Sequence, residues 1–171
     1  TKLGIKLLST GGTAKILKEN NVKVTQISDY TKSSEMLDGR VKTLHPKIFG
    51  GILASRNNKK HMKELKKNKI EPIDIVVVNL YPFEEKIGKN ASYEEAIENI
   101  DIGGPSLIRA AAKNSESVLV IVDPNDYGLA LNEIEKGKVG TELKQSLALK
   151  AFEHTARYDA IICQYFNEKF G

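Results

Sequence analysis

Seven consecutive residues, Arg40 to Pro46, gather the side chains of this sequence best suited to bind an anion and act on a polar ring. Arg40 offers a planar fork of hydrogen-bond donors, and Lys42 offers a compact positive charge. Thr43 adds a hydroxyl and His45 adds an imidazole. A glycine precedes the stretch, so we expect a loop here instead of a helix. Because the cations, the hydroxyl and the imidazole are clustered in it, we expect this loop to hold a phosphate beside a reacting ring. The alternative is a basic surface loop that ends at the proline.

A second candidate anion site is the segment Ser9-Thr10-Gly11-Gly12-Thr13, which follows a short apolar run. It is expected to join a strand to a helix N-terminus, where backbone N–H groups and the helix dipole favour negative charge. The spacing lacks the third glycine of a dinucleotide fingerprint and the Gly-Lys-Ser/Thr of a Walker loop. A tight turn with a threonine cap is the alternative.

Polar side chains also follow the predicted strand 73–78, in the segment that begins at Asn79. Ligands of parallel α/β sheets bind beyond the carboxyl ends of the strands, so Asn79 and Tyr81 lie where ligand groups belong. A phenol there can donate a hydrogen bond to a developing oxyanion. Alternatively, Tyr81 and Phe83 pack a corner that Asn79 caps.

Asp101, followed by Gly103 and Gly104, leads into a predicted helix that ends at Lys113 and Asn114. At ~1.5 Å per residue, a helix between Asp101 and Lys113 separates their backbones by over ~10 Å. The two side chains reach one ligand only if the helix packs along the pocket. The alternative is that each charge matches its end of the helix dipole.

The single cysteine and the three histidines do not predict a metal site. Cys163 lies in an apolar helical run and is expected to be a packed core residue. His61 is expected to be solvated on a lysine-rich helix, and His154 to be structural. No pair of histidines has a metal-ligand spacing backed by carboxylates, so no metal is expected. One cysteine excludes an internal disulfide, which fits a reducing compartment.

The bulk composition is that of one soluble domain: 171 residues, 40% hydrophobic and 28% charged. The net charge of +4 suits an anionic small molecule. Aromatic residues make up only 6% and tryptophan is absent, so no array of stacking side chains for nucleic acid is expected. The apolar runs fall short of the ~20 residues of a membrane span. We expect a cytoplasmic protein without nucleic-acid or membrane partners.

Predicted strands and helices alternate along the chain, which indicates a parallel sheet covered by helices. The strand 73–78 is a β-branched run expected to be buried on both faces. The strands are expected at 5–8, 22–27, 73–78 and 118–122, and the helices at 14–20, 48–53, 58–68, 92–99, 106–113, 126–136 and 141 to about 166. Residues 28–38 are expected to be loop-like, with one possible helical turn at 34–37.

Six segments share the order and spacing of one known family. They are Ser9–Thr13, Arg40–Pro46, Asn79–Phe83, Asp101–Pro105, Ala111–Asn114 and Asp123–Tyr127. Together they resemble the IMP cyclohydrolase domain, the N-terminal half of the bifunctional AICAR formyltransferase/IMP cyclohydrolase of purine biosynthesis. The segment Lys150–Asp159 is similar to the end of that domain, so the resemblance covers essentially the whole chain.

The resemblance implies an α/β, methylglyoxal-synthase-like fold with a doubly wound, mainly parallel sheet flanked by helices, and a homodimer. It also implies a reaction without cofactors. The carboxamide nitrogen of formyl-AICAR attacks the formyl carbon, and loss of water gives IMP.

The resemblance also implies a role for each candidate residue. Lys42, Tyr81, Asp101 and Lys113 match the catalytic positions. The segment Ser9–Thr13, with Arg40 and Thr43, matches the site of the ribose 5′-phosphate. The remaining substrate-binding candidates are Asn79, Gly103, Gly104 and Asn114. His45 is left with a structural role.

The chemistry of ring closure divides the catalytic positions into two pairs. An attacking amide nitrogen needs a base, which we expect to be Asp101, paired with Lys113 through the substrate. The hemiaminal oxygen needs donors as it leaves as water, and Tyr81 and Lys42 are expected to supply them.

The sequence departs from the family pattern in three places. Ser115 follows Lys113 and Asn114 where the family often has an aromatic residue or histidine, and the other two departures are at the ends. The family begins with a further strand, loop and helix before the position of Thr1, and the formyltransferase half is missing after Gly171. Residues 1–171 are therefore expected to form one cyclohydrolase domain whose sheet lacks a central strand. The alternative is a non-catalytic nucleotide- or phosphate-sensing regulatory domain of the same fold. Methylglyoxal synthase itself is disfavoured because its acidic Gly-Asp site is not found.

Overall fold

The computed structural model describes residues 3–81, 83, 85 and 91–171. Pro82, within the predicted Asn79–Phe83 segment, and Thr1 lie outside the described residues. The strands are β1 (Leu8–Ser9), β2 (Thr25–Gln26), β3 (Ile75–Val77) and β4 (Leu119–Ile121). The helices are α1 (Gly11–Glu19), α2 (Ile27–Thr31), α3 (Pro46–Leu53), α4 (Lys59–Lys67), α6 (Tyr93–Glu98), α7 (Gly103–Lys113), η1 (Pro124–Asp126), α8 (Tyr127–Glu135) and α9 (Thr141–Phe170).

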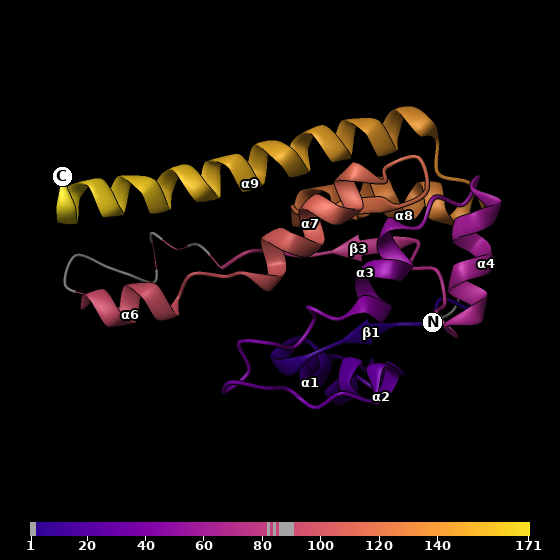
Figure 1. The fold of residues 1–171 in the computed structure, drawn as a ribbon. Helices are drawn as coiled ribbons and strands as arrows, with labels where there is room; N and C mark the ends of the chain where they lie inside the picture. The colour runs from indigo at the N-terminus through magenta and orange to yellow at the C-terminus, as the bar shows by residue number, and fades with distance from the viewer. Residues whose placement is uncertain (1–2, 82, 84, 86–90) are drawn as a thin grey trace.

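The strands confirm a parallel α/β arrangement. β1 pairs with β2, and β3 pairs with β4 with Val76 opposite Val120. Among the described residues these are two separate two-stranded ladders instead of one continuous sheet, because no described strand pairs with both of them. In Figure 1, α1 and α2 lie beside β1, whereas α7 and α8 lie near β3.

The core is centred on β4 and α7. Every residue of β4 is buried, as expected for the predicted strand 118–122. Three consecutive alanines, Ala110 to Ala112, are buried on α7, where their small side chains let neighbouring elements approach closely. α7 contacts α3, α9, β3 and β4, so this one helix joins the β3–β4 ladder to two other helices.

α9 is a 30-residue helix, ~45 Å long at ~1.5 Å per residue. Figure 1 shows it running past α7 and continuing toward α6. One face of α9 is buried, through Ala148, Ala151, Thr155 and Tyr158, whose spacing of three and four residues keeps them on the same side. Within the described residues, no helix is both long enough and apolar enough to cross a membrane.

Local signals placed several helices correctly. The predicted helix 92–99 is confirmed as α6, and it begins with a capping box: Ser92 accepts from Glu95 N–H while the Glu95 side chain accepts from Ser92 N–H. Asn58 caps α4 by accepting from the N–H groups of Lys60 and His61. α9 ends four residues later than expected, at Phe170.

Four expectations about the fold are wrong. Residues 27–31 form α2 where strand and loop were expected, and residues 34–37 form no helical turn. The strand 73–78 is not buried on both faces, because Val77 is 51% exposed. Cys163 is exposed instead of packed in the core. These features depend on which faces of the segment other helices and strands cover. The local pattern of residues does not encode those contacts.

Candidate active site

The glycine-rich segment follows β1 and opens α1. Thr10 is the extended N-cap residue, with φ −127° and ψ 167°. Gly11 has a φ of +52°, a conformation that L side chains rarely adopt. A Cβ placed on Gly11 or Gly12 would meet no described atom within 4 Å. No described side chain therefore crowds these two glycines at the N-terminus of α1, the end of a helix that favours negative charge.

The basic loop is held by acidic partners. The Arg40 guanidinium donates to the Glu98 carboxylate of α6. This hydrogen bond, followed by the charge of Arg40, lowers the pKa of Glu98. Lys42 Nζ lies 3.5 Å from the Glu35 carboxylate. All four side chains are at least 36% exposed, so a phosphate can compete with these carboxylates for the cations.

Thr43 brings the basic loop to the N-terminal turn of α7. A Cβ on Gly103 would lie 3.0 Å from Thr43 Oγ1 and 3.9 Å from Asp101 Oδ1, so these three residues meet at one point. Asp101 Oδ1 accepts from Gly104 N–H at 2.9 Å. The Asp101 N–H donates to the phenol oxygen of Tyr158 at 2.7 Å. Asp101 is thus held by both its backbone and its carboxylate.

Asn79 and Tyr81 lie past the carboxyl end of β3, as the sequence predicted. Asn79 is exposed, and its Nδ2 donates to Tyr127 Oη at 2.9 Å. Tyr81 is 65% exposed. Asn79 also lines a cavity of about 350 Å³ beyond the ends of β3 and β4.

The same cavity holds a charged cluster to which the sequence reasoning gave no role. Lys150 of α9 donates to Asp123 at 2.6 Å and to Asp126 at 2.7 Å. The hydrogen bond from Lys150 lowers the pKa of Asp123, and burial lowers the pKa of His154 on the cavity wall. The available signal was Asp123 itself, an acidic residue directly after the buried strand 118–122.

Lys113 and Asn114 lie at the opposite end of α7. Gly103 and Lys113 are ~15 Å apart along the helix. Lys113 is exposed, whereas the Asn114 side chain donates to the carbonyls of Ile52 at 2.7 Å and Ala54 at 3.1 Å. Asn114 therefore joins α7 to α3, and within this chain the structure does not bring either residue to Asp101.

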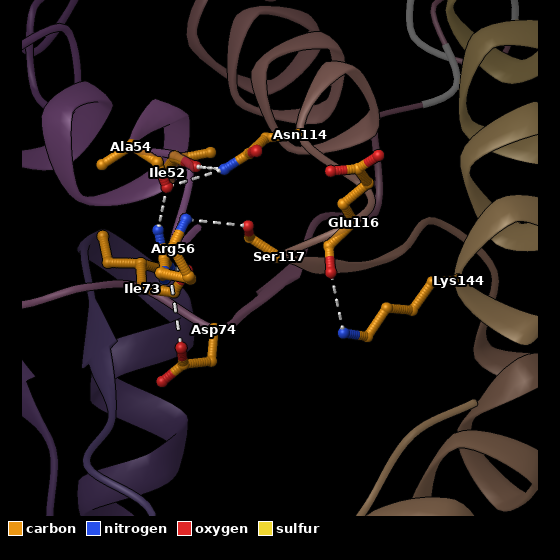
Figure 2. A network of polar contacts seen from close by, with 9 residues as sticks. All are labelled: Ile52, Ala54, Arg56, Ile73, Asp74, Asn114, Glu116, Ser117 and Lys144. Atoms are coloured by element: carbon orange, nitrogen blue, oxygen red, sulfur yellow. Dashed lines mark hydrogen bonds and ion pairs between the residues drawn. The ribbon is translucent and has the colours of Figure 1, made fainter. Parts of the chain in front are cut away.

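Figure 2 shows that Asn114 belongs to a larger network centred on Arg56. The Arg56 guanidinium donates to the carbonyls of Ala54 and Ile73, and its backbone N–H donates to Ser117 Oγ at 3.2 Å. Asp74 lies 3.6 Å away. These bonds connect the C-terminal end of α3, the segment before β3 and the segment after α7, so they hold the C-terminal end of α7 in place.

The remaining histidines have structural partners. His45 Nδ1 accepts from Lys47 N–H and caps α3. His61, expected to be solvated, is partly buried and its Nδ1 accepts from Ser55 N–H. Within the part of the chain that the structure describes, no cluster of three histidine, cysteine, aspartate or glutamate side chains has the arrangement of a metal site.

Two family models match this sequence. The MGS-like domain model matches residues 1–106, and the model described as AICARFT/IMPCHase bienzyme matches residues 111–171.

Individual proteins match along the whole chain. The bifunctional purine biosynthesis protein PurH of Persephonella marina is 56% identical over 171 residues, covering 99% of this chain and 33% of that protein. PurH of Bacillus subtilis is 56% identical over 173 residues, covering 100% and 34%. A solved structure titled "Crystal structure of ForH" is 34% identical, with a TM-score of 0.86, covering 97% of this chain and 86% of that one. The chain thus spans about a third of the length of the curated relatives.

Proposed function

The chain belongs to the MGS-like domain family and is homologous along its whole length to PurH, and we propose on that basis that it is an IMP cyclohydrolase. It converts formyl-AICAR to IMP and water. The whole-length similarity to PurH carries this proposal. The meeting of Thr43, Gly103 and Asp101 supports it, because a hydroxyl and a carboxylate then face one small region.

We assign the ribose 5′-phosphate to the space between the start of α1 and the basic loop. The segment Ser9–Thr13 supplies backbone N–H groups and hydroxyls, and Arg40 and Thr43 supply side-chain donors. Arg40 exchanges Glu98 for the phosphate, a swap of one anion for another at an exposed site. Asn79, Gly103 and Gly104 border the purine end.

We assign the chemistry to Asp101, Lys42, Tyr81 and Lys113. Asp101 takes the proton of the attacking carboxamide nitrogen as the carbon–nitrogen bond forms. Tyr81 and Lys42 hold the oxygen of the former formyl group and assist its departure as water. Because the ring closure is intramolecular, orienting the formyl group contributes much of the acceleration.

Lys113 has the least direct support among these residues. It lies at the far end of α7, so it acts with Asp101 only on a ligand that extends along the helix. Asn114 would border such a ligand, although its side chain amide is already bonded to α3.

We further propose that residues 1–171 form one cyclohydrolase domain, that two copies associate as a homodimer, and that the protein acts in the cytoplasm. The expected partners are purine nucleotides, with no role for nucleic acid, a membrane, a cofactor or a metal.

The test is to incubate the purified protein with formyl-AICAR and follow purine absorbance, with IMP identified by chromatography. Asp101→Asn and Lys113→Ala are each expected to slow IMP formation. Asp29→Asn, which changes an exposed aspartate on α2, should have no effect. A folded wild-type protein that binds the nucleotide but forms no IMP would favour the sensing alternative. Near-full rates in both active-site variants would overturn the acid–base assignment.

A further inference from the structure

Three polar residues of α9 face the candidate active site. Lys150, His154 and Tyr158 are four residues apart, so they share one face of the helix. Lys150 donates a hydrogen bond to Asp123 in the segment after β4, and His154 lines the cavity beyond the ends of β3 and β4. Tyr158 accepts a hydrogen bond from the Asp101 N–H. α9 thus carries polar contacts to two of the loops that form the site.

The contact between Tyr158 and Asp101 is the most buried of these. Tyr158 is only 6% exposed and packs in a cluster with Phe83 and Ala96. Its phenol oxygen accepts the Asp101 N–H at 2.7 Å across 57 positions of sequence. A buried hydroxyl that accepts a backbone N–H fixes the orientation of that peptide, because the alternative leaves a polar group unpaired.

We propose that Tyr158 is a positioning residue that sets the location of the Asp101 carboxylate for ring closure. The proposal rests on the proposed function, since it assigns Tyr158 to the reaction that Asp101 serves.

The geometry gives Tyr158 a specific task. Asp101 precedes α7, and its carboxylate is already held by Gly104 N–H at 2.9 Å. That bond alone leaves the Asp101 peptide able to rotate, and rotation would swing the carboxylate away from Thr43. The Tyr158 phenol, anchored on the long α9, prevents this rotation. A phenol is neutral near neutral pH, and burial raises the pKa of Tyr158 further, so the hydroxyl does not repel the carboxylate.

The chain offers a matched control for removing this hydroxyl. Tyr165 also lies on α9 and packs on Phe83, with ring centroids 5.8 Å apart. Its buried hydroxyl has no hydrogen-bond partner among the described residues. Tyr158→Phe and Tyr165→Phe therefore remove the same atom from neighbouring packing sites, but only the first removes a contact with Asp101.

The experiment measures kcat, KM and the hydrogen exchange of the Asp101 amide in wild type and both variants, at a temperature where all are folded. Tyr158→Phe is expected to lower kcat by about tenfold to a hundredfold, as a misplaced catalytic group does. KM should change less than about threefold, because the phosphate-binding segments are untouched. The Asp101 amide should exchange faster. Tyr165→Phe should match wild type in all three measurements.

A purely structural role for Tyr158 predicts a different result. Tyr158→Phe would then lower the melting temperature while kcat and KM remained as in wild type, with or without faster exchange of the Asp101 amide, and this outcome overturns the proposal. If the wild-type protein forms no IMP, the proposed function fails instead. The exchange of the Asp101 amide then decides alone whether Tyr158 holds this residue, since a protected amide in Tyr158→Phe refutes it.

Discussion

Gly104→Ala should strongly slow the proposed formation of IMP by displacing Asp101. A Cβ on Gly104 would lie 2.4 Å from Asp101 Oδ2 and 2.6 Å from Leu80 Cδ2. To restore even a 3.0 Å separation, the carboxylate oxygen must retreat by 0.6 Å and the leucine methyl by 0.4 Å. The two crowding atoms belong to different side chains, those of Asp101 and Leu80, so both side chains must move to make room for the new methyl group. The space at Gly104 is therefore part of the Asp101 site.

The effect on activity should exceed the effect on stability. Overpacking a buried site costs ~1–3 kcal/mol, but alanine is better than glycine in a helix by ~1 kcal/mol. The net loss of unfolding free energy is then ~0–2 kcal/mol, which lowers the melting temperature by at most ~8 °C. A misplacement of ~1 Å costs a catalytic group on the order of 100-fold in rate, so the 0.6 Å retreat of the Asp101 carboxylate should cost more than about tenfold.

The assay is the rate of IMP formation, measured together with thermal unfolding. Gly128→Ala is the matched control, because it makes the same change at an exposed helical glycine of α8 where a Cβ meets no described atom within 4 Å. It should keep full activity and wild-type or slightly higher stability. If Gly104→Ala is folded and retains more than about a tenth of the wild-type kcat, the reaction does not require the observed position of the Asp101 carboxylate.

Three further changes test other parts of the structure. Burial lowers the pKa of His154 below its ordinary value of 6.5. Below pH 6.5 the unfolded chain therefore binds a proton at His154 more readily than the folded protein does. The free energy of unfolding then decreases as the pH falls from 6.5 through the folded pKa. His154→Gln should therefore flatten the loss of unfolding free energy between about pH 7.5 and about pH 5 in urea titrations, and an unchanged slope would contradict this cause. Arg56→Met leaves the Ile73 carbonyl without its donor, so it should lower the free energy of unfolding by about 2 kcal/mol and the melting temperature by ~4–8 °C. An unchanged melting temperature would mean that the network is dispensable. Ser92→Ala removes the capping box of α6 and should cost about 1 kcal/mol, visible as faster amide exchange in that helix; equal exchange rates would mean that the cap contributes nothing.

Sequence patterns predicted the elements whose signals are local. The Ser92 capping box lies within four residues, and the buried run 118–122 is apolar throughout, so neither depends on distant contacts. The resemblance to a known family located the candidate loops in the same way, from residue types in order. That the Arg40–Pro46 loop meets Asp101 through Thr43 could be expected from the family pattern, but not from spacing alone.

Contacts between distant segments account for what the sequence did not predict. Cys163 lies in an apolar helical run, but it is its neighbours Ile162 and Tyr165 that pack against the cluster of Phe83, whereas the thiol is exposed. Asn114 was expected at the substrate, yet its amide bonds two carbonyls about sixty positions earlier in the chain. The Lys150 cluster joins residues more than twenty positions apart, and neither partner carries a local sign of the other.

The two halves of the candidate site differ in how firmly their side chains are held, and the difference suits their proposed tasks. Arg40 and Lys42 are exposed and, among the described residues, pair with exposed carboxylates, so these interactions are weak and easily exchanged. Asp101 is half-buried, with its backbone bonded to Tyr158 and its carboxylate to Gly104. Capturing a phosphate needs mobile, long-reaching cations, whereas moving a proton needs a group already in position. Under the proposed assignment, the exchangeable contacts therefore lie at the phosphate and the fixed contacts lie at the bond that forms.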